Sequence, residues 1–367
     1  MQSLRISAFI AIAICCITSG ACTKSIAVDN PPARSSKKIS RDFETKVAAL
    51  KETAPPNAIS IKQEYSIRKG EGGHFIYPAA MSTDNDGNTL IADNNGHAIT
   101  SFSPKTRETT VLPTPSTDHA LRFPAAVRKA QQKIYVIDDE GIKIFKENGQ
   151  FEKLLRNYFS MWDFVVAPDG SLYANTAFKA PTDSDGLIVK LNSTGERVSS
   201  FGRRLNHLQF KGMDDRVYLS CSWPLLFAAF RHQPRVAVYD LTKEQLVREF
   251  TVQHPVFSRL ETLSKDESFT NPTASKTALP RYIAGITIMN DRVFVLLHLP
   301  HVEIVEFDFL GNEKNRFRSS EITSVQDYFG LAVHDESGVR KFDVGVSGVT
   351  GAEEIPFLTQ FAVASSH

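Results

Sequence analysis

One type of segment recurs five times along the chain and limits what it can fold into. Each copy joins a polar turn to an apolar strand, and the five copies align without gaps. They are DGNTLIAD (86–93), QQKIYVID (131–138), DGSLYANT (169–176), DDRVYLSC (214–221) and NDRVFVLL (290–297). A second apolar strand follows each copy, as AITSF does at 98–102. Such self-similarity is typical of repeat architectures.

Another apolar strand precedes most copies, so a unit reads strand–turn–strand–loop–strand–turn–strand. Four antiparallel strands in a repeat of about 40–50 residues are typical of a propeller blade. A degraded sixth unit begins at Tyr328, and ISIKQEYSIRKG (59–70) can supply its last strand. We therefore expect an all-β fold, a six-bladed β-propeller of four-stranded antiparallel blades over 59–367, closed by this N-terminal strand. Seven blades are the alternative, because the insert at 251–281 can hide strands.

The first unit resembles an NHL repeat, whose pattern is a glycine-rich turn, Phe-x-x-Pro, Asp-Gly-Asn, an apolar strand ending in Asp, and Asn-x-Ile-x-x-Phe. The matching positions are Gly70, Gly73, Phe75, Pro78, Asp86, Gly87, Asn88, Asp93, Asn95 and Ile99. The second unit matches through Phe123, Pro124, Asp138 and Ile142, and later units keep the apolar framework alone. The resemblance implies a six-bladed propeller and no single activity, because this architecture serves enzymes and binding proteins alike.

The N-terminus is typical of a targeting segment. The apolar run Ile6–Ile17 has the length of a signal-peptide core and is too short to span a bilayer. Small residues before Cys22 resemble a bacterial lipobox, with Ser19 in place of the usual leucine. We expect a signal peptide over 1–21 and lipidation of Cys22 as the first mature residue.

Ordinary signal-peptidase cleavage, after Ala21 or after Ala27, is the alternative. Both readings export the protein. With lipidation, the protein would be anchored through Cys22 in the cell envelope, in the periplasm or at the outer membrane. Only Cys221 lies beyond the leader, so the mature domain can form no internal disulfide.

Residues 22–58 are typical of a tether, being rich in Pro, Ser and Lys without an apolar period. A short helix can form over 41–52, and the basic cluster Lys37, Lys38 and Arg41 can touch phosphate head groups; a solvated linker is the alternative. The formal net charge of +1 gives no long-range attraction for nucleic acid. We expect a monomer that binds no nucleic acid.

Long connections in units three to five mark one end of the ring as a binding face. They are 177–186, 222–234, 298–302 and the insert 251–281. Because binding residues concentrate on loops of a rigid scaffold, we expect a peptide, glycan, protein or acidic small ligand there. The candidate ligand-binding residues are Trp223, Phe227, Phe230, Arg231, His232 and Arg235. The alternative is that this loop folds on itself and buries its own apolar residues.

Catalysis has weaker support in the sequence. His298 and His301 can ligate a metal with Glu303 nearby, and His232 or His254 can join them, but a polar turn explains HLPH as well. The strands expected to line the channel carry Asp163 as their one carboxylate, which disfavours a calcium-dependent lactonase. We therefore expect a non-catalytic binding scaffold without a cofactor. The alternative is a propeller-type hydrolase or lyase with a dispersed metal site.

The stretch from Asp84 to Asp93 alternates acids like the start of a calcium loop. The sixth and twelfth positions from Asp84 hold Thr89 and Asn95, where such a loop needs Gly and an acid. We interpret Asp86-Gly87 as a hairpin turn and Asp93 as a cap on the next turn.

Overall fold

The computed structural model describes residues 57–68, 77–84, 86–113, 119–156, 161–176, 186–204, 215–264, 280–322, 327–347 and 356–364. The predicted signal peptide (1–21), Cys22, the tether up to residue 56 with its helix at 41–52, and most of the 177–186 loop lie outside them. No helix in the described ranges is long and apolar enough to cross a membrane.

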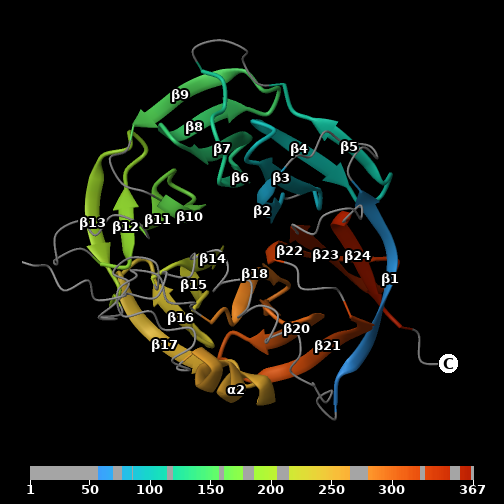
Figure 1. Ribbon diagram of the computed structural model, residues 1–367. Helices are drawn as coiled ribbons and strands as arrows, with labels where there is room; N and C mark the ends of the chain where they lie inside the picture. The colour runs from blue at the N-terminus through green and yellow to red at the C-terminus, as the bar shows by residue number, and fades with distance from the viewer. Residues whose placement is uncertain are drawn as a thin grey trace, which may run out of the picture. The chain divides into compact units, whose positions relative to one another are not determined.

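Four four-stranded antiparallel sheets follow one another along the chain (Figure 1). The first contains β2 (Pro78–Thr83), β3 (Thr89–Asp93), β4 (Ala98–Ser103) and β5 (Glu108–Val111). The second contains β6 (Ala126–Ala130), β7 (Lys133–Asp138), β8 (Gly141–Lys146) and β9 (Phe151–Arg156). The third contains β10 (Met161–Val166), β11 (Leu172–Thr176), β12 (Ile188–Leu191) and β13 (Arg197–Phe201). The fourth contains β14 (Val217–Ser222), β15 (Leu225–Phe230), β16 (Arg235–Asp240) and β17 (Gln245–Thr251).

An eight-stranded sheet completes the fold, with the order β18-β19-β20-β21-β1-β24-β23-β22. One half contains β18 (Ile283–Met289), β19 (Arg292–Leu297), β20 (His301–Asp308) and β21 (Glu313–Ile322). The other contains β1 (Ile59–Arg68), β22 (Asp327–Glu336), β23 (Val339–Ser347) and β24 (Pro356–Val363). The expected closing strand is present, because β1 pairs antiparallel with β24. It also pairs in parallel with β21, which joins the two halves.

The first strand of each unit lies nearest the axis of a ring. Contacts run from β2 to β6, β10, β14, β18, β22 and back to β2, so the circle of inner strands is closed. Figure 1 shows these strands around the centre and β5, β9, β13, β17, β21 and β1 on the outside. The described chain is therefore a propeller ring of antiparallel sheets.

The apolar core lies between neighbouring sheets. One cluster joins the fourth sheet to β18–β20 through residues such as Phe227 and Val295, and another joins the third and fourth through Tyr173 and Phe230. Truncating a buried Phe to Ala costs about 3–5 kcal/mol. Gly330 on β22 is required at one seam, because a Cβ there would lie 2.1 Å from Met81 Cγ. Sheets packed on both faces explain why the strands are nearly continuously apolar.

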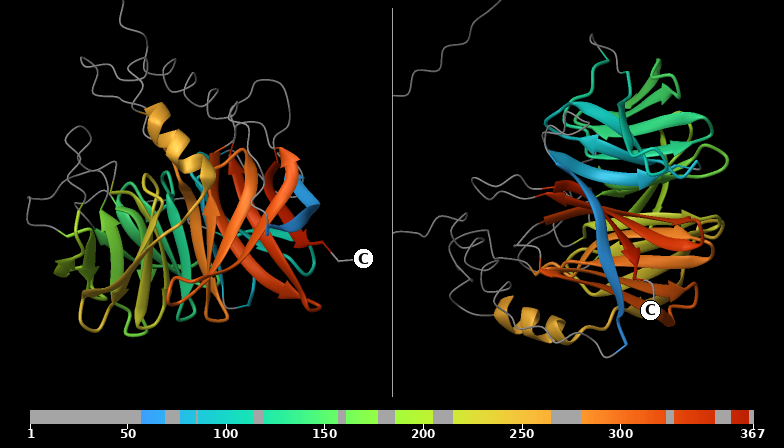
Figure 2. Two further views of the ribbon diagram at one scale, coloured as in Figure 1. Left: turned by 90° about the horizontal axis from the view of Figure 1, so that it is seen from below. Right: turned by 90° about the vertical axis from the view of Figure 1, so that its right-hand side faces the viewer.

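The ring has two different ends. The end that carries the second-to-third-strand turns and the connections between units is called the upper end; the end with the first-to-second and third-to-fourth turns is the lower end. Helix α2 (Pro255–Ser264) rises from the upper end (Figure 2). The described part of the insert 251–281 therefore lies at the end where it was expected.

Short turns at the lower end have sequence-encoded geometry. Gly87 has φ +82°, and Asp84 Oδ1 accepts hydrogen bonds from the N–H groups of Asp86 (2.9 Å) and Asn88 (2.8 Å). At the upper end, Asp93 Oδ1 accepts from the N–H groups of Tyr77 (2.7 Å) and Gly96 (3.0 Å). These carboxylates bind the backbone, so the interpretation of this stretch as scaffold is confirmed.

The fourth unit corrects the predicted alignment. Residues 214–221 were aligned with second strands, and 222–234 were taken as a long loop. Instead β14 is the innermost strand, Trp223 and Pro224 form a tight turn, and β15 is the second strand, paired with both β14 and β16. The Trp-Pro turn contains no glycine or Asn-Gly pair, so nothing in the sequence signals a hairpin there. The apolar strand that follows it was therefore assigned to a loop.

Candidate functional site

The upper part of the central channel is narrow and lined by small side chains. A cavity of about 40 Å³ lies there among the inner strands. Its walls include Ala79, Ala80, Ala125, Ala126, Gly285 and Gly330, together with the larger side chains of Arg128, Trp162, Asp163 and Tyr218. Small residues let the strands approach the axis, so the few large polar and aromatic groups dominate the chemistry of the channel.

An ion pair crosses the channel wall from β6 to β10. The Arg128 guanidinium donates to Asp163 Oδ1 at 2.6 Å and to the carbonyl of Leu219 at 3.2 Å. Asp163 also accepts from the backbone N–H groups of Phe164 and Leu219, each at 2.8 Å. Burial raises the pKa of Asp163, and Arg128 with the two N–H groups opposes this rise. Asp163, the one channel-strand carboxylate seen in the sequence, thus connects β6, β10 and β14.

Two arginines and two aromatic rings meet at the upper mouth of the channel. The guanidinium of Arg216 lies 5.0 Å from the centroid of the Trp162 ring, and that of Arg231 lies 5.5 Å from it. Arg231 also donates to the Tyr218 hydroxyl at 2.7 Å. The rings of Trp162 and Tyr218 are edge to face, 6.3 Å apart. We call Trp162, Arg216, Tyr218 and Arg231 the upper-mouth cluster.

His232 contacts the Arg216 guanidinium and fixes its position. Its Nε2 lies 2.8 Å from Arg216 Nη2, and its Nδ1 lies 2.8 Å from the carbonyl oxygen of Pro280. A guanidinium can only donate, so Nε2 accepts and Nδ1–H donates to Pro280. Burial, followed by the charge of Arg216, lowers the pKa of His232 to about 2. His232 is therefore neutral at physiological pH.

The predicted ligand-binding residues do not form one surface. Phe227 and Phe230 are fully buried on β15, where they pack in the clusters between sheets, so their placement in a loop was wrong. Trp223 is 45% exposed, but its turn belongs to the lower end. Arg235 lies on the third strand of its sheet and pairs with Glu249 at 2.8 Å. Only Arg231 and His232 lie at the upper mouth; a ligand-binding role for the set stays a prediction.

The histidines proposed as metal ligands belong to different surroundings. His298 packs edge to face on Tyr328, and His301 begins β20. Within the described ranges, one group of three side chains of metal-ligand type lies close together: Asp138, Asp139 and Glu140. The fully buried Lys143 ammonium pairs with Asp138 at 2.7 Å and Glu140 at 2.6 Å. That group therefore already surrounds a cation of the chain itself and does not suit a metal ion.

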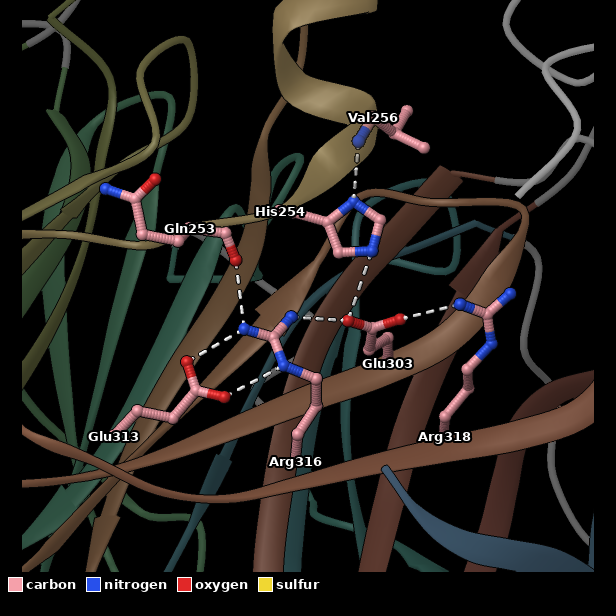
Figure 3. A network of polar contacts seen from close by, with 7 residues as sticks. All are labelled: Gln253, His254, Val256, Glu303, Glu313, Arg316 and Arg318. Atoms are coloured by element: carbon pink, nitrogen blue, oxygen red, sulfur yellow. Dashed lines mark hydrogen bonds and ion pairs between the residues drawn. The ribbon is translucent and has the colours of Figure 1, made fainter. Parts of the chain in front are cut away.

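A buried charge network anchors α2 to the ring beside β20 and β21 (Figure 3). Glu303 is fully buried and accepts from Arg316 at 2.6 Å and Arg318 at 3.2 Å. His254 Nδ1 accepts from the Val256 N–H, so its Nε2, 3.4 Å from Glu303, carries the hydrogen. Burial acts to raise the pKa of Glu303, but His254 and Arg316 outweigh it and hold the pKa below its usual value.

Arg316 extends this network to the outer strand. It forms a two-pronged pair with Glu313, at 2.9 and 2.8 Å, and donates to the carbonyl of Gln253 at 2.9 Å. These partners lie on β21 and on the segment leading into α2. The carboxylates and guanidiniums of this network pair with one another. This pairing indicates that the network holds the insert on the ring rather than taking part in catalysis.

Sequence reasoning missed Arg128, Trp162, Arg216 and Tyr218 as site residues. Each sits on or next to a strand that opens a unit, and such strands line the channel. Their positions on these predicted channel-lining strands could have identified Arg128 and Trp162. Arg216 and Tyr218 were hidden by the misplaced fourth unit.

Comparisons with known proteins identify the fold. No protein-family model matches the chain, and no curated protein matches it. A streptogramin B lyase structure is 9% identical, covers 85% of this chain and 99% of its own, and has a TM-score of 0.52. A luciferin-regenerating enzyme is 10% identical, covers 82% and 95%, and has a TM-score of 0.51. Regucalcin from Agrobacterium tumefaciens is 12% identical, covers 84% and 95%, and has a TM-score of 0.49. Identities this low show the fold alone, which is that of a β-propeller.

Proposed function

We propose that the protein is an enzyme of the propeller hydrolase or lyase type that binds a flat organic anion at the upper mouth. The supporting observation is that Arg216 and Arg231 both lie over the ring of Trp162. The indole, the Tyr218 hydroxyl and the neutral His232 ring orient the two guanidiniums at the mouth. Oriented guanidiniums suit planar carboxylates, and an indole face suits a ring.

The likeness to known structures favours an enzyme over the non-catalytic scaffold. Two structures with a TM-score above 0.5 carry the names of enzymes, a lyase and a luciferin-regenerating enzyme. Because their identity to this chain is low, they support a class of protein and supply no residue roles. The roles proposed below come from this chain alone.

Tyr218 is the proposed proton-transfer group. Its hydroxyl oxygen accepts a hydrogen bond from Arg231, and its ring lines the upper cavity. The hydrogen bond from Arg231 positions this hydroxyl, and a positioned phenol can exchange a proton with a bound molecule. Arg216 and Arg231 are the proposed anion-binding residues, and His232 positions Arg216.

The test compares matched aromatic esters, 4-acetoxybenzoate and its uncharged methyl ester. We expect the anion to have the higher kcat/KM by about tenfold, the value of about 1.4 kcal/mol of added binding. Tyr218→Phe should lower kcat with little change in KM, whereas Arg216→Gln should raise KM. In D₂O, deuterium in the methyl group of the released acetate indicates elimination through a ketene, and an unlabelled methyl group indicates direct hydrolysis. Equal use of both esters, or no effect of Arg216→Gln, contradicts the proposal.

We further propose that the eight-stranded sheet counts as two blades, which makes six, and that the units are NHL-like. Support comes from its two inner strands, β18 and β22, and from β1, which supplies the fourth strand beside β22–β24. Further support comes from an equivalent hydrogen bond in the first two units. Asp93 accepts from the backbone N–H of Tyr77 and Asp138 from that of Arg122, and both donors precede the first strand of the unit. A crystal structure that shows a different number of inner strands would refute this count.

We also propose that the protein is exported and anchored through lipid on Cys22. The apolar run and the small residues before Cys22 support this. Mass spectrometry of the mature N-terminus tests it. A diacylated or triacylated Cys22 is the expected result, and an unmodified Cys22 or a mature chain beginning at Val28 would contradict lipidation.

A further inference from the structure

A larger cavity opens the channel at the lower end. It has a volume of about 470 Å³, within the range of small-molecule sites. Its walls come from the inner strands and the turns that follow them, and Arg128 lines both this cavity and the upper one. We propose that this lower cavity is a second binding site, for an uncharged amphipathic small molecule whose carbonyl oxygen binds Arg128. The proposal is independent of the function assigned to the upper mouth.

The lower cavity wall combines apolar and polar groups. Its aliphatic side chains are Met81, Val165, Val166, Leu219, Ile286, Ile288, Met289, Leu331 and Val333. Hydroxyl groups interrupt this surface at Ser82, Thr83, Ser220 and Thr287. Ser82 Oγ and Thr83 Oγ1 are buried and have no hydrogen-bond partner. A wall of this mixed composition suits an amphipathic molecule, whose apolar part packs against the aliphatic side chains.

The acids at the outer rim of this cavity are already neutralised. Asp84 pairs with Lys129 at 3.2 Å and also accepts from the turn that it caps. Asp335 pairs with Arg340 at 2.6 Å. These pairs leave the rim with little attraction for a cationic ligand.

His334 also lines the cavity, but its nitrogens face the protein. Nδ1 lies 3.6 Å from the fully buried Asp343, and Nε2 lies 3.4 Å from the Gln360 amide nitrogen. Gln360 and Thr89 both donate to Asp343. Cys221 is inert as well, because burial raises the pKa of its thiol to about 11. The cavity is therefore better suited to binding than to catalysis.

Arg128 at the inner end supplies the polar anchor. Its contacts with Val127, Asp163 and Leu219 use three N–H groups, and a guanidinium has five. Two N–H donors thus remain for a ligand. Because Asp163 neutralises the arginine at 2.6 Å, a second carboxylate would be repelled by it, whereas a carbonyl oxygen would not.

The test uses two probes with the same chain, octanamide and octanoate, in calorimetric titrations of the full-length protein at pH 7. We expect saturable binding of octanamide and binding of octanoate weaker by about tenfold or more. Ser220→Phe and Thr287→Phe, which fill the cavity, should abolish octanamide binding while the melting temperature shows that the protein is folded. Trp162→Phe at the upper mouth is the matched control and should leave the affinity unchanged.

Arg128→Lys keeps the charge beside Asp163 and removes the planar donors, so it should weaken octanamide binding about tenfold. Three results would overturn the proposal. They are equal or tighter binding of octanoate, no saturation by octanamide up to about 10 mM, and octanamide binding that survives both cavity-filling substitutions. Since Ser220→Phe and Thr287→Phe leave the Arg128 pair intact, the test stands even if Arg128→Lys fails to fold.

Discussion

The two ends of the ring are built by different means. At the lower end, short turns join neighbouring strands, and their geometry is encoded by a few adjacent residues such as Gly87 and Asp84. At the upper end, connecting residues are fixed by partners distant in sequence: Glu303 holds His254, and the Pro280 carbonyl holds His232. The lower end is thus built from turns with local geometry, whereas the upper end carries charge networks that join distant segments.

The channel reflects the same division. Its upper mouth presents guanidiniums over an indole, and its lower cavity presents aliphatic side chains and hydroxyls. Arg128 and Asp163 separate the two. One scaffold thus offers two chemically unlike environments, and substitutions can address each one separately.

The largest effect is expected where the two ends meet. Arg128→Met leaves the buried Asp163 carboxylate without its cation, which should lower the free energy of unfolding by about 3–5 kcal/mol. Arg340→Met is the matched control, because its pair with Asp335 is half exposed and should matter by less than about 1 kcal/mol. Urea unfolding at pH 7 measures both. Equal losses in the two variants would mean that the channel pair is no special anchor.

The upper-end network should come next. Glu303→Gln removes the charge shared by Arg316 and Arg318, and should cost about 3 kcal/mol at pH 7. The pKa of Glu303 is lowered, so its contribution is complete above the ordinary glutamate pKa and is lost as pH falls through the lowered value. The difference between wild type and variant should therefore shrink on acidification. A gap that stays constant between pH 7 and pH 3 would argue against this linkage.

His232 gives a pH dependence of intermediate size. Its pKa falls from 6.5 to about 2 on folding, so the unfolded chain takes up a proton first as pH drops. The free energy of unfolding should therefore decrease as the pH falls below 6.5. The decrease due to His232 should be about 2 kcal/mol between pH 7 and pH 5. His232→Gln should lack this part of the slope in chemical unfolding measured across that range. Identical slopes would show that His232 is not held neutral.

The lower-end turns should give the smallest effects. Gly87→Ala introduces a Cβ at φ +82° with open space around it, so only backbone strain is added, about 1 kcal/mol. Gly338→Ala, at φ +80° and also in open space, should match it. Thermal unfolding of the two variants checks the pair. A loss as large as that of Arg128→Met would show that lower-end turns carry more than local geometry.

Local patterns predicted the sheets well and the site poorly. The repeated turn-and-strand segments identified β3, β7, β11 and β19 as second strands, because hairpin turns and apolar strands are written in adjacent residues. The fourth unit was shifted by one strand, because the Trp-Pro turn carries no glycine signal. That shift moved Phe227 and Phe230 from the core into an imagined loop.

The site itself depends on contacts that no local pattern contains. Trp162 meets Arg216 and Arg231 only because β10 and β14 are neighbours in the ring. Asp163 could be singled out from sequence, but its partner Arg128 lies on another sheet. Ring closure brings these residues together, so no local sequence pattern could reveal the cluster.

The chain's two tryptophans allow the central claim to be tested directly, since Trp162 lies at the upper mouth and Trp223 at the lower end. The measurement is a fluorescence titration with 4-nitrobenzoate, a flat anion that quenches indole. In the Trp223→Phe protein, we expect saturable quenching of Trp162. In the Trp162→Phe protein, we expect only the linear, collisional quenching of Trp223. Saturable quenching of Trp223, or none of Trp162, would contradict an anion site at the upper mouth.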